Sequence, residues 1–162
     1  MASRLNPYLI FSGNAREAME FYATVLGGEL TLSTFGELGG PDAETPDNIM
    51  HGQIVSDRGY WLMGADSAPD QEGTPQNSPV SISGDEGDAI RRYFEALSDG
   101  GQVTVPLEKQ MWGDEFGMLT DKFGVSWLVN IGTGVGPVFY NPWLKAHVDH
   151  AGAHAGEYAG HG

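Results

Sequence analysis

The sequence predicts an α+β protein built from two copies of one module, each with the order strand, helix, strand, strand, strand. Residues 12–28 and 83–101 show the same succession of a Ser-Gly-Asx break, an amphipathic stretch with an aromatic pair, and a Gly-Gly exit. The offset between equivalent positions stays at 71–73 residues. A repeat of this length indicates two copies of one supersecondary unit that share a core. A functional site is therefore expected in a cleft that both copies form together.

The first copy begins with a short apolar strand at residues 8–11, between a proline and the Ser-Gly break. Asn14 is expected to cap the next helix, with Glu17 three residues on as in a capping box. Apolar residues at helical spacing carry this helix to Leu26, where two glycines end it. Residues 36–47 are rich in Gly, Pro and acidic residues and are predicted to form a loop. The remaining strands of this copy are expected at residues 29–35, 49–55 and 60–63.

The second copy repeats this order after a polar, proline-containing linker at residues 66–78. Its elements are expected to be a strand at residues 80–83, a helix at 86–97, and strands that start at 103 and span 116–120 and 125–131. Residues 1–131 are thus predicted to form a single domain, with module one at 5–66 and module two at 79–131. The Gly-, Ala- and His-rich residues 132–162 fall outside the repeat and are predicted to be a C-terminal tail.

Composition excludes several classes of function. Eight Lys and Arg residues against 22 Asp and Glu give a formal charge of −14 over 162 residues. An acidic field of this size repels nucleic acid and anionic membranes, so neither is an expected partner. Cysteine is absent, which excludes disulfides, thiolate zinc sites and thiol chemistry. The sequence shows neither a signal peptide nor an apolar run of membrane-spanning length, so a cytoplasmic protein is expected.

A set of short motifs links the chain to a known family. The motifs of the first copy are Asn6-Pro7-Tyr8-Leu9-Ile10-Phe11, Gly13-Asn14-Ala15, Ala18-Met19-Glu20-Phe21-Tyr22, Leu26-Gly27-Gly28-Glu29-Leu30, Met50-His51-Gly52 and Leu62-Met63-Gly64-Ala65-Asp66. The most specific ones follow in the second copy, at Trp112-Gly113-Asp114-Glu115-Phe116-Gly117, Thr120-Asp121-Lys122-Phe123-Gly124-Val125 and Trp127. Together they resemble the PhnB-like branch of the vicinal oxygen chelate superfamily, also called the glyoxalase/bleomycin-resistance/dioxygenase superfamily.

The resemblance covers residues 5–131 and implies the glyoxalase/bleomycin-resistance fold, in which two tandem βαβββ modules form curved mixed sheets around a cleft. It also implies a homodimer, in which the modules pair within one chain or between two. Members of this branch have often been labelled demethylubiquinone methyltransferases. In this sequence, however, no strand is followed by the Gly-rich turn and helix of a Rossmann cofactor site.

Enzymes of the superfamily bind a metal through His, Gln or Glu on the first and last strands of each module. The matching positions here fall near Pro7, Gly64, Pro79 and Leu128, none of which supplies a ligand side chain. A divalent site needs three or four protein ligands, so no metal or other cofactor is predicted in the cleft. Two alternatives remain open: an atypical divalent-metal set of His51, Asp66 and Glu115, and adventitious binding by the tail histidines His147, His150 and His154.

Aromatic and methionine side chains concentrate in the motif-bearing strands and predict a cavity suited to a flat or apolar ligand. The candidate cleft residues are Tyr8, His51, Trp61, Met63, Asp66, Trp112, Glu115, Phe116 and Trp127. The competing interpretation is that half or more of these residues pack a helix against a sheet. Catalytic residues are not identified, although His51 and Glu115 would form an acid/base pair if they met.

Three functions are compatible with these patterns. The first is binding of a small apolar or aromatic molecule without the usual metal site. The second is a metal-dependent lyase, isomerase or dioxygenase reaction around His51. The third is a structural or interaction domain whose cleft is filled by its own core.

Overall fold

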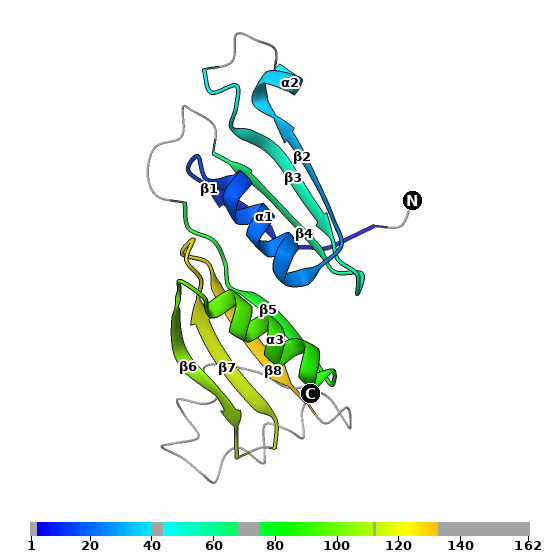
Figure 1. Ribbon diagram of the computed structural model, residues 1–162, viewed down its shortest axis with the longest axis vertical. Helices are drawn as coiled ribbons and strands as arrows, with labels where there is room; N and C mark the ends of the chain where they lie inside the picture. The colour runs from blue at the N-terminus through cyan, green and yellow to red at the C-terminus, as the bar shows by residue number, and fades with distance from the viewer. Residues whose placement is uncertain (1–2, 40–43, 68–74, 112, 133–162) are drawn as a thin grey trace.

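A computed structural model describes residues 3–39, 44–67, 75–111 and 113–132. These residues form two βαβββ modules arranged one beyond the other (Figure 1). The first module consists of β1 (Tyr8–Phe11), α1 (Ala15–Leu26), β2 (Glu29–Thr34), α2 (Phe35–Gly39), β3 (Ile49–Val55) and β4 (Trp61–Asp66). The second consists of β5 (Val80–Gly84), α3 (Gly87–Ser98), β6 (Gln102–Lys109), β7 (Glu115–Thr120) and β8 (Ser126–Ile131).

Both modules have one sheet topology. The strand orders are β1-β4-β3-β2 and β5-β8-β7-β6, with the first strand parallel to the last and the other pairs antiparallel. Tyr8 pairs with Met63 in the first sheet, and Val80 pairs with Trp127 in the second. The predicted α+β fold with a duplicated module is therefore confirmed.

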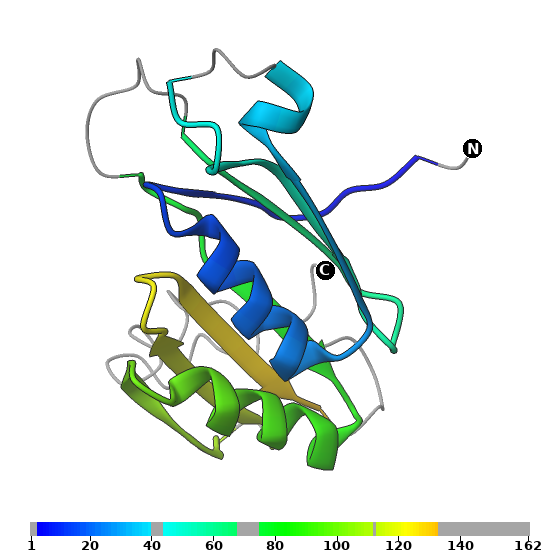
Figure 2. The ribbon, with the colours of Figure 1, turned by 45° about the horizontal axis from the view of Figure 1, so that its top comes forward.

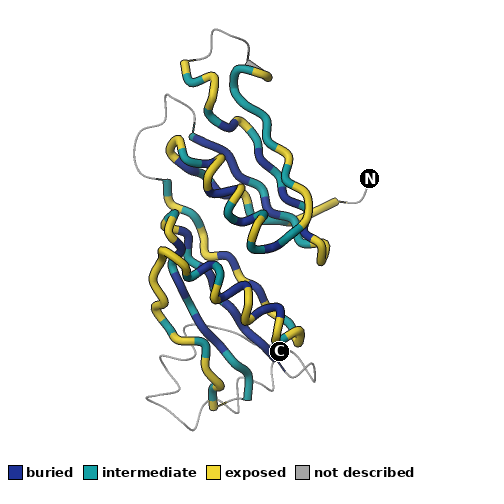
Figure 3. The backbone as a smooth tube through the Cα atoms, in the orientation of Figure 1, coloured by how far each residue is buried: buried dark blue, intermediate teal, exposed yellow. Residues whose placement is uncertain are grey.

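The two modules share one hydrophobic core. α1 and α3 lie next to each other along the junction, and each covers one face of its own sheet (Figures 1 and 2). Tyr22 of α1 is fully buried, and its ring centroid lies 5.5 Å from that of Trp127 in β8. Buried positions concentrate in the inner strands and on the inward sides of the helices, whereas β6 is largely exposed (Figure 3). This distribution follows from one face of each sheet packing on a helix.

The Gly-Gly exit has the same physical cause in both modules. A Cβ at Gly28 would overlap the carbonyl oxygen of Val55, and a Cβ at Gly101 would overlap that of Thr120. Only glycine lets the chain pass this close to the neighbouring hairpin. The repeated sequence thus marks a repeated close approach of two backbone segments.

Three expectations from the sequence were wrong. Asn14 makes no capping hydrogen bond through its side chain. The amides of Gly13 and Ala15 instead donate to Asp66 Oδ1, at 2.7 and 3.0 Å, because β4 continues three residues beyond its predicted end and brings this carboxylate beneath the helix. Residues 36–47 are not entirely loop, since α2 begins directly after β2.

The end of the predicted linker also has a defined role. The side-chain amide of Asn77 donates to the carbonyl oxygen of Ile10 at 3.0 Å, and its oxygen accepts from the amide of Ile10 at 2.8 Å. Asn77 therefore pairs with the outer edge of β1 as a neighbouring strand would.

The predicted tail beyond residue 132 lies outside the described residues. Among the described helices, none combines the length and apolar character that crossing a bilayer requires.

Candidate functional site

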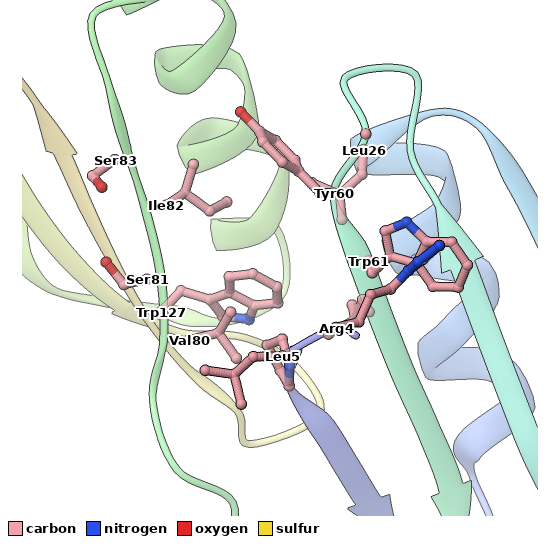
Figure 4. A pocket seen from close by; sticks show the side chains of 13 residues that line it. Arg4, Leu5, Leu26, Tyr60, Trp61, Val80, Ser81, Ile82, Ser83 and Trp127 are labelled. Atoms are coloured by element: carbon pink, nitrogen blue, oxygen red, sulfur yellow. The ribbon is translucent and has the colours of Figure 1, made fainter. Parts of the chain in front are cut away.

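A pocket of about 390 Å³ opens where the two modules meet (Figure 4). Its walls come from the N-terminal arm before β1, the end of α1, the β3–β4 turn, the start of β4, β5 and β8. Tyr60 and Trp61 form the side belonging to module one, and Val80, Ile82 and Trp127 form the opposite side. Leu5 projects between them from the arm and is fully exposed. This volume and mainly apolar lining are typical of small-molecule sites.

Trp61 borders the pocket and has a cation against one face of its ring. The guanidinium carbon of Arg4 lies 3.6 Å from the indole centroid, the geometry of a cation–π contact. Arg4 itself is exposed, and among the described residues it forms no ion pair with an acidic group. The arm therefore covers one face of Trp61.

Trp127 is held rigidly from behind the pocket. Its indole N–H donates to Asp121 Oδ2 at 2.8 Å, and the Tyr22 hydroxyl donates to the same oxygen at 2.6 Å. The amides of Phe123 and Val125 donate to Asp121 Oδ1 at 2.8 and 3.1 Å. Burial, together with the adjacent Asp121 carboxylate, raises the pKa of Tyr22 far above its usual value, so this tyrosine stays protonated and donates.

The structure brings four candidate residues to one surface, the open face of the first sheet. Gly52 and Gly64 face Met19 of α1, so the neighbouring positions 51, 53, 61 and 63 in the regular part of β3 and β4 point away from the helix. His51, Trp61 and Met63 belong to this set, and Tyr8 of β1 lies beside Met63. The Tyr8 hydroxyl lies 3.3 Å from His51 Nδ1. We call this surface, defined by Tyr8, His51, Trp61 and Met63, the open face.

The other candidate residues lie elsewhere. Asp66 is buried and also accepts from the amide of Ile49 at 2.8 Å, so its carboxylate has three backbone partners. Glu115 accepts from Arg91 of α3 at 2.6 and 3.1 Å and therefore does not meet His51. Phe116 is buried within the second sheet. Trp112 lies outside the described residues.

The donor set does not fit the metal that the superfamily's enzymes use. Pro7, Gly64, Pro79 and Leu128 occupy the expected ligand positions, and a Cβ at Gly64 would already lie 2.9 Å from Met19 Sδ. Within the described ranges, no three His, Asp or Glu side chains gather closely enough to hold a metal ion. The alternative set of His51, Asp66 and Glu115 is therefore not assembled.

Asp121 is the functional residue that the sequence reasoning missed. An aspartate that opens a tight turn commonly accepts amides two and more residues ahead, and this signal was present at residues 121–125. Its contact with Tyr22 spans 99 residues and has no local signature. The sequence therefore did not predict that Asp121 holds Tyr22 and Trp127 in place.

Comparison with known proteins agrees with the fold. The family described as 3-demethylubiquinone-9 3-methyltransferase matches residues 3–130. The crystal structure of protein PA1353 from Pseudomonas aeruginosa is 40% identical, covers 80% of this chain and 98% of its own, and has a TM-score of 0.69.

Two further solved structures share the fold at lower identity. A PhnB protein from Bacillus cereus is 24% identical, covers 80% of this chain and 100% of its own, and has a TM-score of 0.64. A glyoxalase/bleomycin resistance protein/dioxygenase superfamily member from Sphaerobacter thermophilus is 19% identical, covers 82% and 98%, and has a TM-score of 0.52. The chain therefore belongs to the family described as 3-demethylubiquinone-9 3-methyltransferase, and it shares its fold with the PhnB protein and the glyoxalase/bleomycin resistance protein/dioxygenase superfamily member.

Proposed function

We propose that this protein binds a small, flat, apolar or aromatic molecule in the pocket between its modules. The observation that carries the proposal is the pocket of about 390 Å³, with the half-buried aromatic residues Tyr60 and Trp61 on one side and the buried Trp127, fixed by Asp121, beneath the other. Aromatic walls provide a large contact area and favour ring-on-ring packing. The methyltransferase in the family's name is not part of this proposal, which rests on the chemistry of the pocket.

Ligand entry changes two groups. A ligand ring takes the place of the Arg4 guanidinium on Trp61, and Arg4 moves into solvent at little cost because it is exposed. Leu5 then packs on the ligand, and covering an exposed leucine side chain fully contributes about 1.5–3 kcal/mol. The N-terminal arm thus closes over the bound molecule.

The open face supplies polar recognition. Trp61 belongs both to the pocket and to this face, so a ligand that extends along β4 meets Met63 and then the Tyr8–His51 pair. Tyr8 and His51 can each donate or accept a hydrogen bond. We propose that this pair orients a ligand hydroxyl or carbonyl, and that the protein acts as a homodimer that shelters the exposed Tyr8 and Met50.

The test is binding of a neutral fluorescent aromatic probe, N-phenyl-1-naphthylamine, to untagged protein. Trp61→Ala should weaken binding at least about tenfold, because an aromatic contact and its buried area are lost together. Val103→Ala, an equally simple truncation of an exposed residue on β6, should leave binding unchanged. Equal binding by both variants contradicts the proposed pocket.

Two further measurements test the proposed homodimer and the metal content of the purified protein. Light scattering should give twice the mass of one chain, and a monomer at micromolar concentration contradicts the dimer. Metal analysis should find no stoichiometric metal that depends on His51. A bound metal that is lost in His51→Ala would favour a metal-dependent reaction instead.

A further inference from the structure

A second hollow lies on the helix side of the molecule, between α1 and α3. It has a volume of about 490 Å³ and shares no lining residue with the pocket between the modules. Phe21 and Val25 of α1 face Tyr93 and Ala96 of α3 across an apolar floor. We call this hollow the helix groove. Its floor is apolar and aromatic, which suits a ring system.

Two cations stand at the helix groove, Arg92 of α3 and Lys122 of the β7–β8 turn. Within the described part of the chain, neither forms an ion pair with an acidic group, whereas Arg58 and Arg91 both do. Lys122 Nζ instead lies 4.2 Å from the centroid of the Phe21 ring. In a chain with a formal charge of −14 and only eight Lys and Arg residues, the helix groove brings two of these cations to one hollow.

We propose that the helix groove is a separate binding site for a small aromatic monoanion such as an aryl carboxylate. The ring packs on Phe21 and Tyr93, and the carboxylate lies between Arg92 and Lys122. An arginine fork binds a carboxylate through two parallel hydrogen bonds, and such charge-assisted bonds are about twice as strong as neutral ones.

Asp99 determines which ligand charge the helix groove prefers. Its carboxylate lines the same groove, so the three ionised side chains there sum to a single positive charge. A monoanion neutralises this charge, whereas a dianion such as an aryl phosphate leaves an excess negative charge beside Asp99 within a strongly acidic protein. The groove therefore prefers a carboxylate over a phosphate on the same ring.

Calorimetric titration of the full chain with naphthoate tests the proposal. Arg92→Gln and Lys122→Gln should each weaken naphthoate binding at least about tenfold, in line with the loss of a charge-assisted contact. Asp99→Asn should strengthen it severalfold. Lys109→Gln is the matched control, because it removes one positive charge from an exposed residue on β6, away from the groove. These positions are all exposed, and unchanged melting temperatures will show that the variants fold.

The probes separate this site from the pocket between the modules. Naphthoate should bind more tightly than its neutral analogue naphthalenemethanol and more tightly than naphthyl phosphate, and Trp61→Ala should not change its affinity. The proposal is overturned if Arg92→Gln and Lys122→Gln bind naphthoate as well as Lys109→Gln does. It is equally overturned if the neutral alcohol binds as tightly as the carboxylate, or if Trp61→Ala alone abolishes naphthoate binding.

Discussion

The turn between the last two strands is built alike in both modules, but it begins with a different residue in each. In module one, Ser56 N–H donates to the carbonyl of Tyr60, and Ser56 Oγ accepts from the amide of Tyr60 at 2.9 Å. In module two, Asp121 makes the corresponding bonds with Val125. The serine is satisfied within its turn, whereas the second oxygen of Asp121 reaches Tyr22 and Trp127. Because a carboxylate has a second oxygen, Asp121 both closes its own turn and binds side chains of both modules.

The difference explains where the pocket obtains its rigid wall. Tyr22 comes from α1 of module one, while Trp127 and Asp121 come from module two. The three buried side chains form a hydrogen-bonded set across the junction, with Trp127 facing the pocket on its other side. The two sheets follow the repeated sequence, whereas the contact between the modules depends on Asp121, a position at which the two copies differ.

Converting Asp121 to the residue of the other module should have the largest effect. Asp121→Ser keeps an acceptor for the amide of Val125 but leaves the Tyr22 hydroxyl and Trp127 indole N–H buried without a partner. Each buried unsatisfied donor costs about 1–3 kcal/mol, so the free energy of unfolding should fall by roughly 3 kcal/mol or more. Urea titration measures this change.

The control is Ser56→Ala, which removes only the local bond to Tyr60 and should cost about 1 kcal/mol. Equal losses for Asp121→Ser and Ser56→Ala would show that Asp121 is merely a turn residue. The ligand probe gives a second readout, because Asp121→Ser should also weaken binding by releasing Trp127.

A contact could be predicted from the sequence only where its two residues lie close together along the chain. The repeat, the glycine exits and the alternation of the strands are local signals, and they predicted the strands and the two long helices of both modules with most boundaries correct to within one residue. The Asp66 cap joins residues 51 apart and the Asp121 joint residues 99 apart, so no local pattern revealed either. α2 was missed because its five residues, Phe-Gly-Glu-Leu-Gly, include two glycines, which disfavour a helix.

The candidate site shows the same limit. Trp61 and Trp127 both lie at the pocket between the modules, and their part in binding a ligand stays a prediction. Sequence alternation does not say which face of a strand turns toward the helix. Trp61 and Met63 therefore emerge on the open face, whereas Trp127 lies on the side that packs against α1.

Removing the hydroxyl from Tyr22 should have an intermediate effect that depends on pH. The raised pKa of Tyr22 keeps its proton on the folded protein, whereas the unfolded chain releases it near pH 10. The contribution of this group to stability is therefore intact below pH 10 and is lost as pH rises above it, by about 1.4 kcal/mol per pH unit.

Tyr22→Phe should lower the free energy of unfolding by about 1–2 kcal/mol at pH 7. Between pH 10 and pH 11.5 the variant should lose stability less steeply than the wild type, because it lacks this titrating group. Denaturant titrations across that range measure both slopes. Parallel slopes would mean that Tyr22 ionises in the folded protein as freely as in the unfolded chain.

The outer edges of the two sheets give the smallest expected effect. Asn77 closes the edge of β1 at Ile10, and among the described residues no side-chain amide does the same for β5. Asn77→Ala should cost about 1 kcal/mol, since the two backbone groups of Ile10 regain water in place of the amide. The amide proton of Ile10 should then exchange with solvent markedly faster.

Asn77→Asp sharpens this comparison, because a carboxylate accepts from the amide of Ile10 but cannot donate to its carbonyl. Hydrogen exchange at Ile10 should therefore stay slow in Asn77→Asp and become fast in Asn77→Ala, while exchange in β5 stays unchanged in both. If both variants expose Ile10 equally, Asn77 acts only by ordering the segment before β5. Slow exchange in Asn77→Asp alone identifies one side chain as the substitute for a neighbouring strand.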